Sequence, residues 1–203
     1  MKLFATLLLL GLCIATFLWW RARARWRARY IDAYPYQKYL DRYLAARRPE
    51  LSEAQRKLVF GGLREYFQLC RQARGRRVAM PSRAAHDAWL EFILHTRRYR
   101  RFCARGFGRF LHHAPPETLR SPGIAQDDLK RAWRLSCRRE GINPQAPRTL
   151  PLLFALDAML GIDDGFRYQA GCLPAGPVDT GGACPLHAAC GGVCAGSACR
   201  KAQ

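Results

Sequence analysis

The chain begins with an uninterrupted apolar run from Leu3 to Trp20. These 18 residues carry no charge, and their only polar side chains are two threonines. As a helix the run is about 27 Å long, close to the hydrocarbon thickness of a bilayer. Trp19 and Trp20 close it at the place where an aromatic belt is expected. The pattern predicts a transmembrane anchor over residues 1–20.

A basic flank over residues 21–29 follows the run. Its arginines are Arg21, Arg23, Arg25, Arg27 and Arg29, whereas only Lys2 and the terminal amine precede the run. The positive-inside rule therefore predicts a single-pass protein of the inner (plasma) membrane, with the N-terminus outside and the domain in the cytoplasm. There the flank would contact anionic headgroups, at about 1 kcal/mol per arginine. For the flank, the alternative is a nucleic-acid-binding arm. For the apolar run, the alternatives are a buried core helix and a cleaved secretory signal, although no A-x-A site precedes the arginines.

Residues 30–168 show helical rather than strand periodicity. Ser52 with Gln55 three residues later is a capping-box signature, and apolar residues recur at helical spacing from there to Cys70. No stretch alternates between apolar and polar residues as a half-buried strand does. The pattern predicts an all-α domain of four to five helices.

Three further helices are expected in this domain. One starts at Ser82 and ends near Gly106. Another covers about residues 124–139, and a short apolar helix covers about residues 149–160 with Thr149 as its N-cap.

The composition changes again after the domain. Residues 169–203 are rich in Gly and Ala and contain five of the nine cysteines, which predicts a flexible, disordered tail. The net charge of the 203-residue chain is +19, and nearly all the basic residues are arginine. Such a surface attracts anionic lipid or nucleic acid, and an anchored protein already lies beside the first of these.

One segment carries a family resemblance. Residues 80–115 read MPSRAAHDAWLEFILHTRRYRRFCARGFGRFLHHAP, and residues 150–162 read LPLLFALDAMLGI. The chain here resembles the bacterial glycine-rich domain-containing proteins, a membrane-anchored family of unknown function with a Gly/Cys-rich tail. The shared features are Trp89, the E-F-I-L run that follows, Tyr99, Cys103 and the F-G-R-F-L-H-H segment. The resemblance spans about residues 51–168 and implies no particular chemistry.

One departure from this family concerns a histidine. The family usually has histidine directly after the tryptophan, where this chain has Leu90. A site that used that histidine would be lost here, although His86, one turn earlier on a helix, could reach the same face.

Two sets of side chains near the resemblance are candidate metal ligands. Asp87, Glu91 and His95 recur every four residues and would lie on one helix face, where nearby arginines favour a salt-bridged surface. His95, Cys103, His112 and His113 are zinc-type ligands, but their spacing matches no compact zinc signature, so structural roles are favoured. A metal-dependent enzyme would rest on these histidines.

The tail holds a third candidate metal set. Its members are Cys184, His187, Cys190, Cys194 and Cys199. In a reducing cytoplasm, closely spaced thiolates and an imidazole suit a metal such as zinc. If the topology were reversed, the same cysteines would form disulfides.

Recognised catalytic signatures are missing from the sequence. It has no G-x-S-x-G elbow, no P-loop, no Rossmann glycine pattern and no H-E-x-x-H. We therefore expect a membrane-anchored helical interaction module that binds an unidentified protein partner. A metal-dependent enzyme and a nucleic-acid binder remain alternatives.

Overall fold

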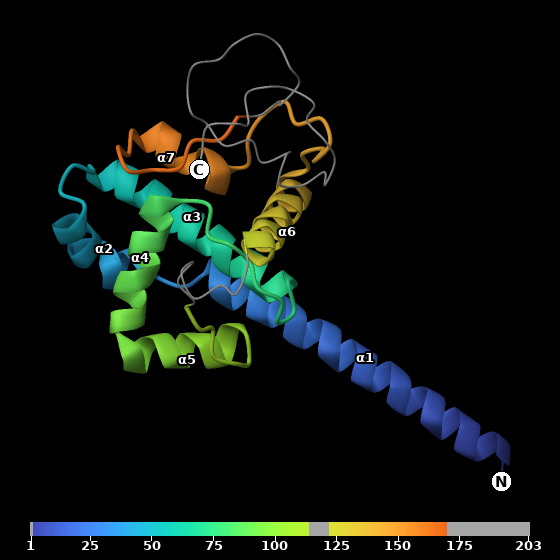
Figure 1. Cartoon of the computed structure of the whole chain (residues 1–203). Coiled ribbons are helices and arrows are strands. Elements are labelled where there is room, and N and C mark those ends of the chain that lie inside the picture. The colour runs from blue at the N-terminus through green and yellow to red at the C-terminus, as the bar shows by residue number, and fades with distance from the viewer. Residues whose placement is uncertain (1, 114–121, 170–203) are drawn as a thin grey trace.

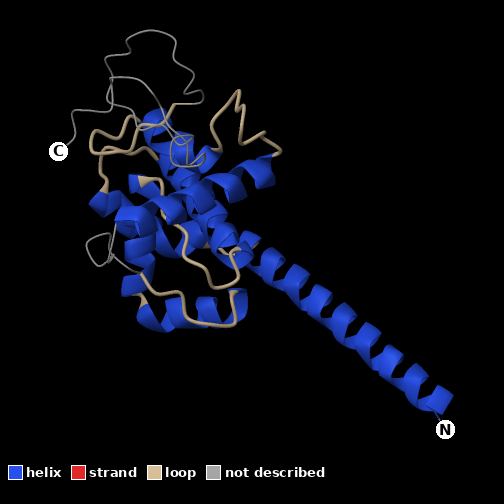
Figure 2. Ribbon diagram, turned by 45° about the vertical axis from the view of Figure 1, so that its right-hand side comes forward, coloured by secondary structure: helices blue, strands red, loops and turns tan. Residues whose placement is uncertain are grey.

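The computed structural model describes residues 2–113 and 122–169. Within these residues the chain is all-helical and has no strand, which confirms the predicted fold class (Figures 1 and 2). The helices are α1 (Lys2–Asp32), α2 (Tyr36–Arg47), α3 (Glu53–Gln72), α4 (Arg83–Leu94), α5 (Thr96–Gly106), α6 (Pro122–Glu140) and α7 (Leu152–Leu160). Six of these seven follow the anchor, against the four or five expected in the domain.

The anchor and its arginine flank form one helix. α1 has 31 residues and is therefore about 46 Å long. It projects from the domain as a rod (Figure 1). The large apolar side chains between Phe4 and Trp20 are exposed, and α1 is the one helix among the described residues that is long and apolar enough to cross a membrane.

The last turns of α1 are part of the domain core. Ile31 is fully buried. Gln68 of α3, itself buried, donates from Nε2 to the carbonyl oxygen of Ala28 at 2.9 Å and to Oδ1 of Asp32 at 2.7 Å. Because no flexible linker separates the rod from the core, the direction of α1 is fixed relative to α3.

The centre of the core is aromatic. α2, which the sequence analysis did not predict, buries Tyr36 against Phe67 of α3, with ring centroids 6.0 Å apart. Phe92 of α4 and Phe102 of α5 belong to the same cluster, with their ring centroids 5.1 Å apart. Four helices that are separate in sequence therefore share one apolar centre, which buries far more area than any of them could bury alone.

α3 is the helix around which the others pack. Its predicted capping box is confirmed, since the Gln55 backbone N–H donates to Ser52 Oγ at 3.3 Å and the Ser52 N–H donates to Gln55 Oε1 at 2.9 Å. Gly62 faces α7 so closely that an added Cβ would lie 2.6 Å from Leu156 Cδ2. Glycine here lets α7 approach the backbone of α3.

The single helix expected from Ser82 to Gly106 is two helices. Ser82 does cap α4, accepting a hydrogen bond from the Ala85 N–H at 3.1 Å. His95 then leaves the helical region with φ −81° and ψ 58°, and α5 starts at the next residue. After the break, α5 packs its apolar side on the aromatic core.

The start of the last helix also differs from the prediction. α7 begins at Leu152 with Pro151 as its N-cap, not at Thr149. A residue before proline is disfavoured in the helical region, so the chain stays extended up to Pro151.

A buried carboxylate from α7 caps α4. Asp157 accepts hydrogen bonds from Ser82 Oγ at 2.6 Å, from the Arg83 N–H at 2.6 Å, from the Ala84 N–H at 3.2 Å and from the Phe166 N–H at 2.9 Å. The first turn of a helix leaves backbone donors without partners, and a carboxylate there also complements the helix dipole. Asp157 therefore joins α7, α4 and the segment after α7.

Candidate functional site

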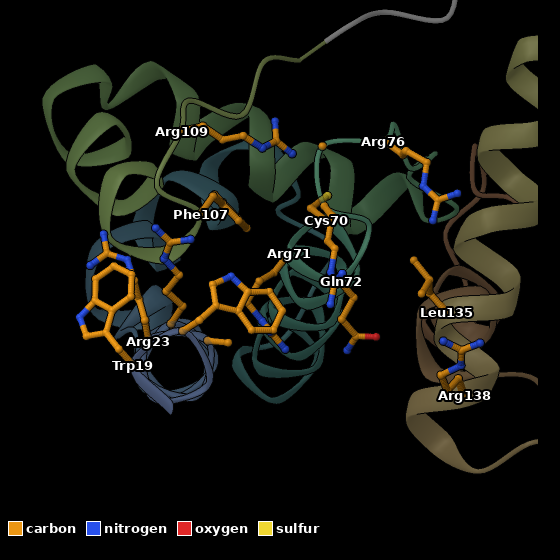
Figure 3. A pocket seen from close by; sticks show the side chains of 15 residues that line it. Trp19, Arg23, Cys70, Arg71, Gln72, Arg76, Phe107, Arg109, Leu135 and Arg138 are labelled. Carbon is orange, nitrogen blue, oxygen red and sulfur yellow. The ribbon is translucent and has the colours of Figure 1, made fainter. Parts of the chain in front are cut away.

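A cavity of about 790 Å³ lies where α1 meets the rest of the domain (Figure 3). Trp19 and Arg23 of α1 line one side, and Leu135 and Arg138 of α6 line the opposite side. The end of α3, the loop after it and the segment after α5 complete the lining. We call it the arginine cavity after the residues Arg23, Arg27, Arg71, Arg74, Arg76, Arg109 and Arg138, which all line it.

The α1 wall combines aromatic and basic side chains. Arg23 and Arg27 are one helical turn apart and so share a face. The Arg23 guanidinium lies 5.3 Å from the ring centroid of Trp19, and Arg74 from the loop after α3 lies 5.1 Å from that of Trp20. These cation–π contacts hold guanidinium groups against the last apolar residues of the anchor.

The electrostatics of the cavity are one-sided. Among the residues that the structure describes, seven arginines line it and no Asp or Glu does. Burial, and then the neighbouring Arg139, lower the pKa of Arg71 below its ordinary value, as expected where positive charges crowd together. Guanidinium groups offer forked donors that match phosphate and carboxylate oxygens, so the cavity is suited to an anion.

A glycine shapes the edge of the cavity. After α5 the chain turns at Gly108, whose φ is +73° and whose N–H donates to the carbonyl oxygen of Cys103 at 3.1 Å. A Cβ at Gly108 would collide with the guanidinium of Arg27. Glycine therefore allows both the turn and the close approach of Arg27, and the turn leads directly to Arg109.

The described thiols in the domain have the properties of core residues. Burial raises the pKa of Cys70, at the cavity, to about 12, and that of Cys137 to about 11. Burial also raises the pKa of Cys103. All three are protonated near neutral pH and lack the thiolate character that a cysteine nucleophile needs.

The predicted membrane-surface arginines separate into two groups. Arg23 and Arg27 line the arginine cavity, whereas Arg21, Arg25 and Arg29 do not. Arg21 lies over the Phe17 ring, 5.4 Å from its centroid. Contact of the whole flank with anionic headgroups stays a prediction.

The acidic set on α4 is engaged in ion pairs. Arg48 donates to Asp87 Oδ2 at 2.7 Å, and Arg47 donates to Glu91 Oε1 at 2.9 Å. Asp87 is 3% exposed. The partners come from the end of α2, so this face joins α2 to α4, as a salt-bridged face would. The ring of the third member, His95, packs on another side chain of α2, that of Tyr43, at 4.4 Å between centroids.

The three histidines predicted as alternative metal ligands have separate surroundings. His95 lies at the end of α4, and the His112 ring packs on Phe110 at 4.7 Å. His113 instead contacts His86, with their Nε2 atoms 2.8 Å apart. Among the residues that the structure describes, no group of three or more His, Cys, Asp or Glu side chains could hold a metal ion.

The tail prediction concerns residues that the structure does not describe. Cys184, His187, Cys190, Cys194 and Cys199 lie outside the described ranges. Zinc binding by this set stays a prediction.

Sequence reasoning recognised only part of the cavity. It identified Arg23 and Arg27 in the flank, but not Arg109 or Arg138. The only available signal was the local density of arginine, which is high throughout this chain. Convergence of four separate segments on one cavity is a property of the packing.

One family model covers most of the chain. It is described as UCP032817-like and matches residues 26–188, so the chain belongs to this family, which has no assigned activity. No curated protein and no solved structure matches. The match is consistent with the predicted membership of a family of unknown function, while the glycine-rich naming is not confirmed by it.

Proposed function

We propose that this member of the UCP032817-like family is a membrane-anchored module that binds a phosphate-bearing, anionic lipid headgroup in the arginine cavity. The observation that carries the proposal is that seven arginines, and no acidic residue of the described ranges, line that cavity directly beside Trp19 and Trp20. For the interaction module expected from the sequence, the proposal names anionic lipid headgroups as the class of ligand.

The position of the cavity along α1 supports a lipid source for the anion. If Trp20 marks the hydrocarbon boundary, Arg23 and Arg27 lie about 5 and 10 Å beyond it along the helix axis. The polar layer of each leaflet is about 5–8 Å thick. A headgroup whose chains remain in the bilayer could therefore place its phosphate between α1 and the loop that carries Arg74.

The charge of the site supports an anion over a zwitterion. Each basic side chain near an anionic surface contributes about 1 kcal/mol. A phosphate diester offers two acceptor oxygens to forked donors, and two or three arginines can bind them together. The ammonium group of a zwitterionic lipid would instead meet further guanidinium groups and be repelled.

We propose that α1 spans the inner membrane with its N-terminus outside, which places the cavity in the cytoplasmic leaflet. A full-length chain with a green fluorescent protein at its C-terminus should be fluorescent in a bacterial host, because that reporter does not mature after export through the general secretory route. A non-fluorescent fusion of normal abundance, together with activity of a periplasmic reporter fused at the same position, would show that the orientation is the opposite one.

The lipid proposal can be tested by titrating the full-length chain in neutral detergent micelles with short-chain phosphatidylglycerol or phosphatidylcholine. The readout is calorimetric heat together with tryptophan fluorescence. Arg109→Ala with Arg138→Ala removes two cavity charges outside α1, so membrane insertion is unaffected. We expect this pair to weaken phosphatidylglycerol binding by about 2 kcal/mol, or roughly 30-fold.

The matched control removes two exposed arginines from α5, with Arg97→Ala and Arg101→Ala. It has the same net charge as the cavity variant and should bind within about threefold of the wild type, since exposed charges away from the ligand are screened. Equal losses in the two variants would mean that bulk charge attracts the lipid. Equal wild-type affinity for the two lipids would refute the headgroup site itself.

A further inference from the structure

A second cluster lies away from the arginine cavity, at the start of α4. His86 of α4 and His113 of the segment after α5 face each other, with 2.8 Å between their Nε2 atoms and 5.0 Å between their ring centroids. Trp89, one turn further along α4, packs edge-on against His113 at 5.0 Å and against His86 at 6.4 Å. The function proposed above makes no use of this pair.

Both imidazoles are held by the core. The first turn of α4, which carries His86, is capped by Ser82 and Asp157. The segment before His113 is tied down at Leu111, whose carbonyl oxygen accepts a hydrogen bond from the Tyr99 hydroxyl at 2.6 Å.

The same hydroxyl links this segment to α4. Tyr99 accepts a hydrogen bond from the Trp89 indole N–H at 3.0 Å, and Trp89 lies on the same helix as His86. The two histidines come from segments 27 residues apart, yet they are fixed to one framework. The framework therefore holds the two imidazoles close together, as a two-ligand metal site requires.

The spacing of the two nitrogens fits a chelate. Bonds of about 2.1 Å at right angles place two ligand nitrogens about 3.0 Å apart, and tetrahedral bonds place them about 3.4 Å apart. The separation of the two nitrogens would open by about 0.2 Å for an octahedral ion and about 0.6 Å for a tetrahedral one. Both rings would also turn, because centroids 5.0 Å apart mean that the two Nε2 atoms point almost directly at each other. The alternative is a shared proton, with one ring as donor and the other as acceptor.

The charges around the pair are mixed. Asp87 adjoins His86 but is engaged by Arg48 and Arg47. The charges of Arg83 and Arg47 lower the pKa of His86, whereas the charge of Asp87 raises it. Burial, and then His113, lower the pKa of His86.

We propose that His86 and His113 form a two-imidazole site for a first-row divalent transition metal, with water completing the coordination shell. Imidazole nitrogen suits zinc, nickel, cobalt and copper. The site is independent of the headgroup proposal and of the cysteines predicted to bind zinc in the tail. Because only two protein ligands contribute, we expect exchangeable binding rather than a buried structural ion.

The test uses Co²⁺ alone as the probe, titrated into the full-length chain in neutral detergent with a non-thiol reductant. Cobalt bound by imidazole and water shows weak visible bands, whereas cobalt bound by thiolate shows intense charge-transfer bands in the near ultraviolet, so binding at the tail is separable. We expect one cobalt of the imidazole type per chain. His86→Gln and His113→Gln should each weaken it about tenfold or more.

The matched control is His112→Gln, which alters the exposed neighbour of His113 and should leave the titration unchanged. A second measurement needs no variant. Co²⁺ should protect His86 and His113, but not His112, from carbethoxylation in the wild-type chain, as read by mass spectrometry. Unchanged cobalt binding in both site variants, a wild-type spectrum of thiolate type only, or equal modification of all three histidines with and without cobalt would each overturn the proposal.

Discussion

Replacing Asp157 with alanine should destabilise the domain more than any surface substitution. The side chain is 1% exposed and comes from α7, yet three of its four hydrogen-bond donors belong to Ser82 and the first turn of α4. The substitution leaves the start of α4 without its cap and cuts the link between the two helices. It removes no apolar side chain, so the effect isolates the polar contacts.

The magnitude follows from the burial of the four donors. Ser82 Oγ and the Ala84 N–H are buried, and each loses a bond to a charged acceptor worth about 1.5–2 kcal/mol. The Arg83 and Phe166 N–H groups are partly buried, so water can replace the carboxylate and each loses about 0.5 kcal/mol. The total is about 4–5 kcal/mol, which is a large part of the stability of a typical domain.

Urea unfolding of the full-length chain in micelles, followed by tryptophan fluorescence, measures this loss. Asp163→Ala removes an exposed carboxylate six residues along the chain and should change the free energy of unfolding by less than about 0.5 kcal/mol. Asp157→Asn keeps one acceptor oxygen, so its loss in the free energy of unfolding should lie between those of Asp157→Ala and Asp163→Ala. If Asp157→Ala cost less than about 1 kcal/mol, the carboxylate could not be the cap that the geometry indicates.

Three further predictions concern the glycine at the edge of the cavity, the loss of stability at low pH, and the contacts that hold α1 against α3. Gly108→Ala should cost about 1–2 kcal/mol, because φ is positive there, and should weaken headgroup binding in the micelle titration by displacing the Arg27 guanidinium. Ion pairing, chiefly with Arg48, lowers the pKa of Asp164 from 3.8 to about 2. Its contribution to stability is therefore complete above about pH 5 and is lost as the pH falls toward 2, so unfolding curves of the wild type and Asp164→Asn should converge in acid. Gln68→Ala removes two bonds to the last turn of α1 and should lower thermal stability by about 2 kcal/mol, with weaker headgroup binding in the same titration.

The parts of the fold that local chemistry determines were predictable from the sequence. A continuous apolar run predicts a helix long enough to cross a bilayer, and α1 is such a helix. The capping box at Ser52 and the cap at Ser82 are interactions within four residues, and both are confirmed. Helical periodicity with no alternating segment gave the correct fold class.

The parts that depend on distant segments were not predictable. α2 is an exception that was overlooked, since its buried residues Tyr36, Leu40 and Leu44 recur every four residues, which is helical spacing. The helix break at His95 has no glycine or proline near it, so no local sequence signal predicts it. After the break, Phe102 of α5 packs on the aromatic core.

The cavity illustrates the same limit for function. Alternating arginines after an apolar run are typical of a stop-transfer flank, and nothing local distinguishes Arg23 and Arg27 from Arg21 or Arg25. They differ in which way they face, because α1 packs on α3 in one rotation about its own axis. The Gln68 hydrogen bond and the buried Ile31 fix that rotation.

Because its walls come from both α1 and the rest of the domain, the arginine cavity exists only while α1 stays docked. A ligand that binds both walls therefore stabilises the docked state by RT ln(1 + [L]/Kd), or about 2.7 kcal/mol at a ligand concentration 100 times Kd. By linkage, a change in the Gln68 contacts that populates an undocked state also weakens binding of the ligand, in proportion to the docked fraction that is lost. A protein built this way would couple the composition of the leaflet to the rigidity of the joint between anchor and domain, without any movement inside the domain itself.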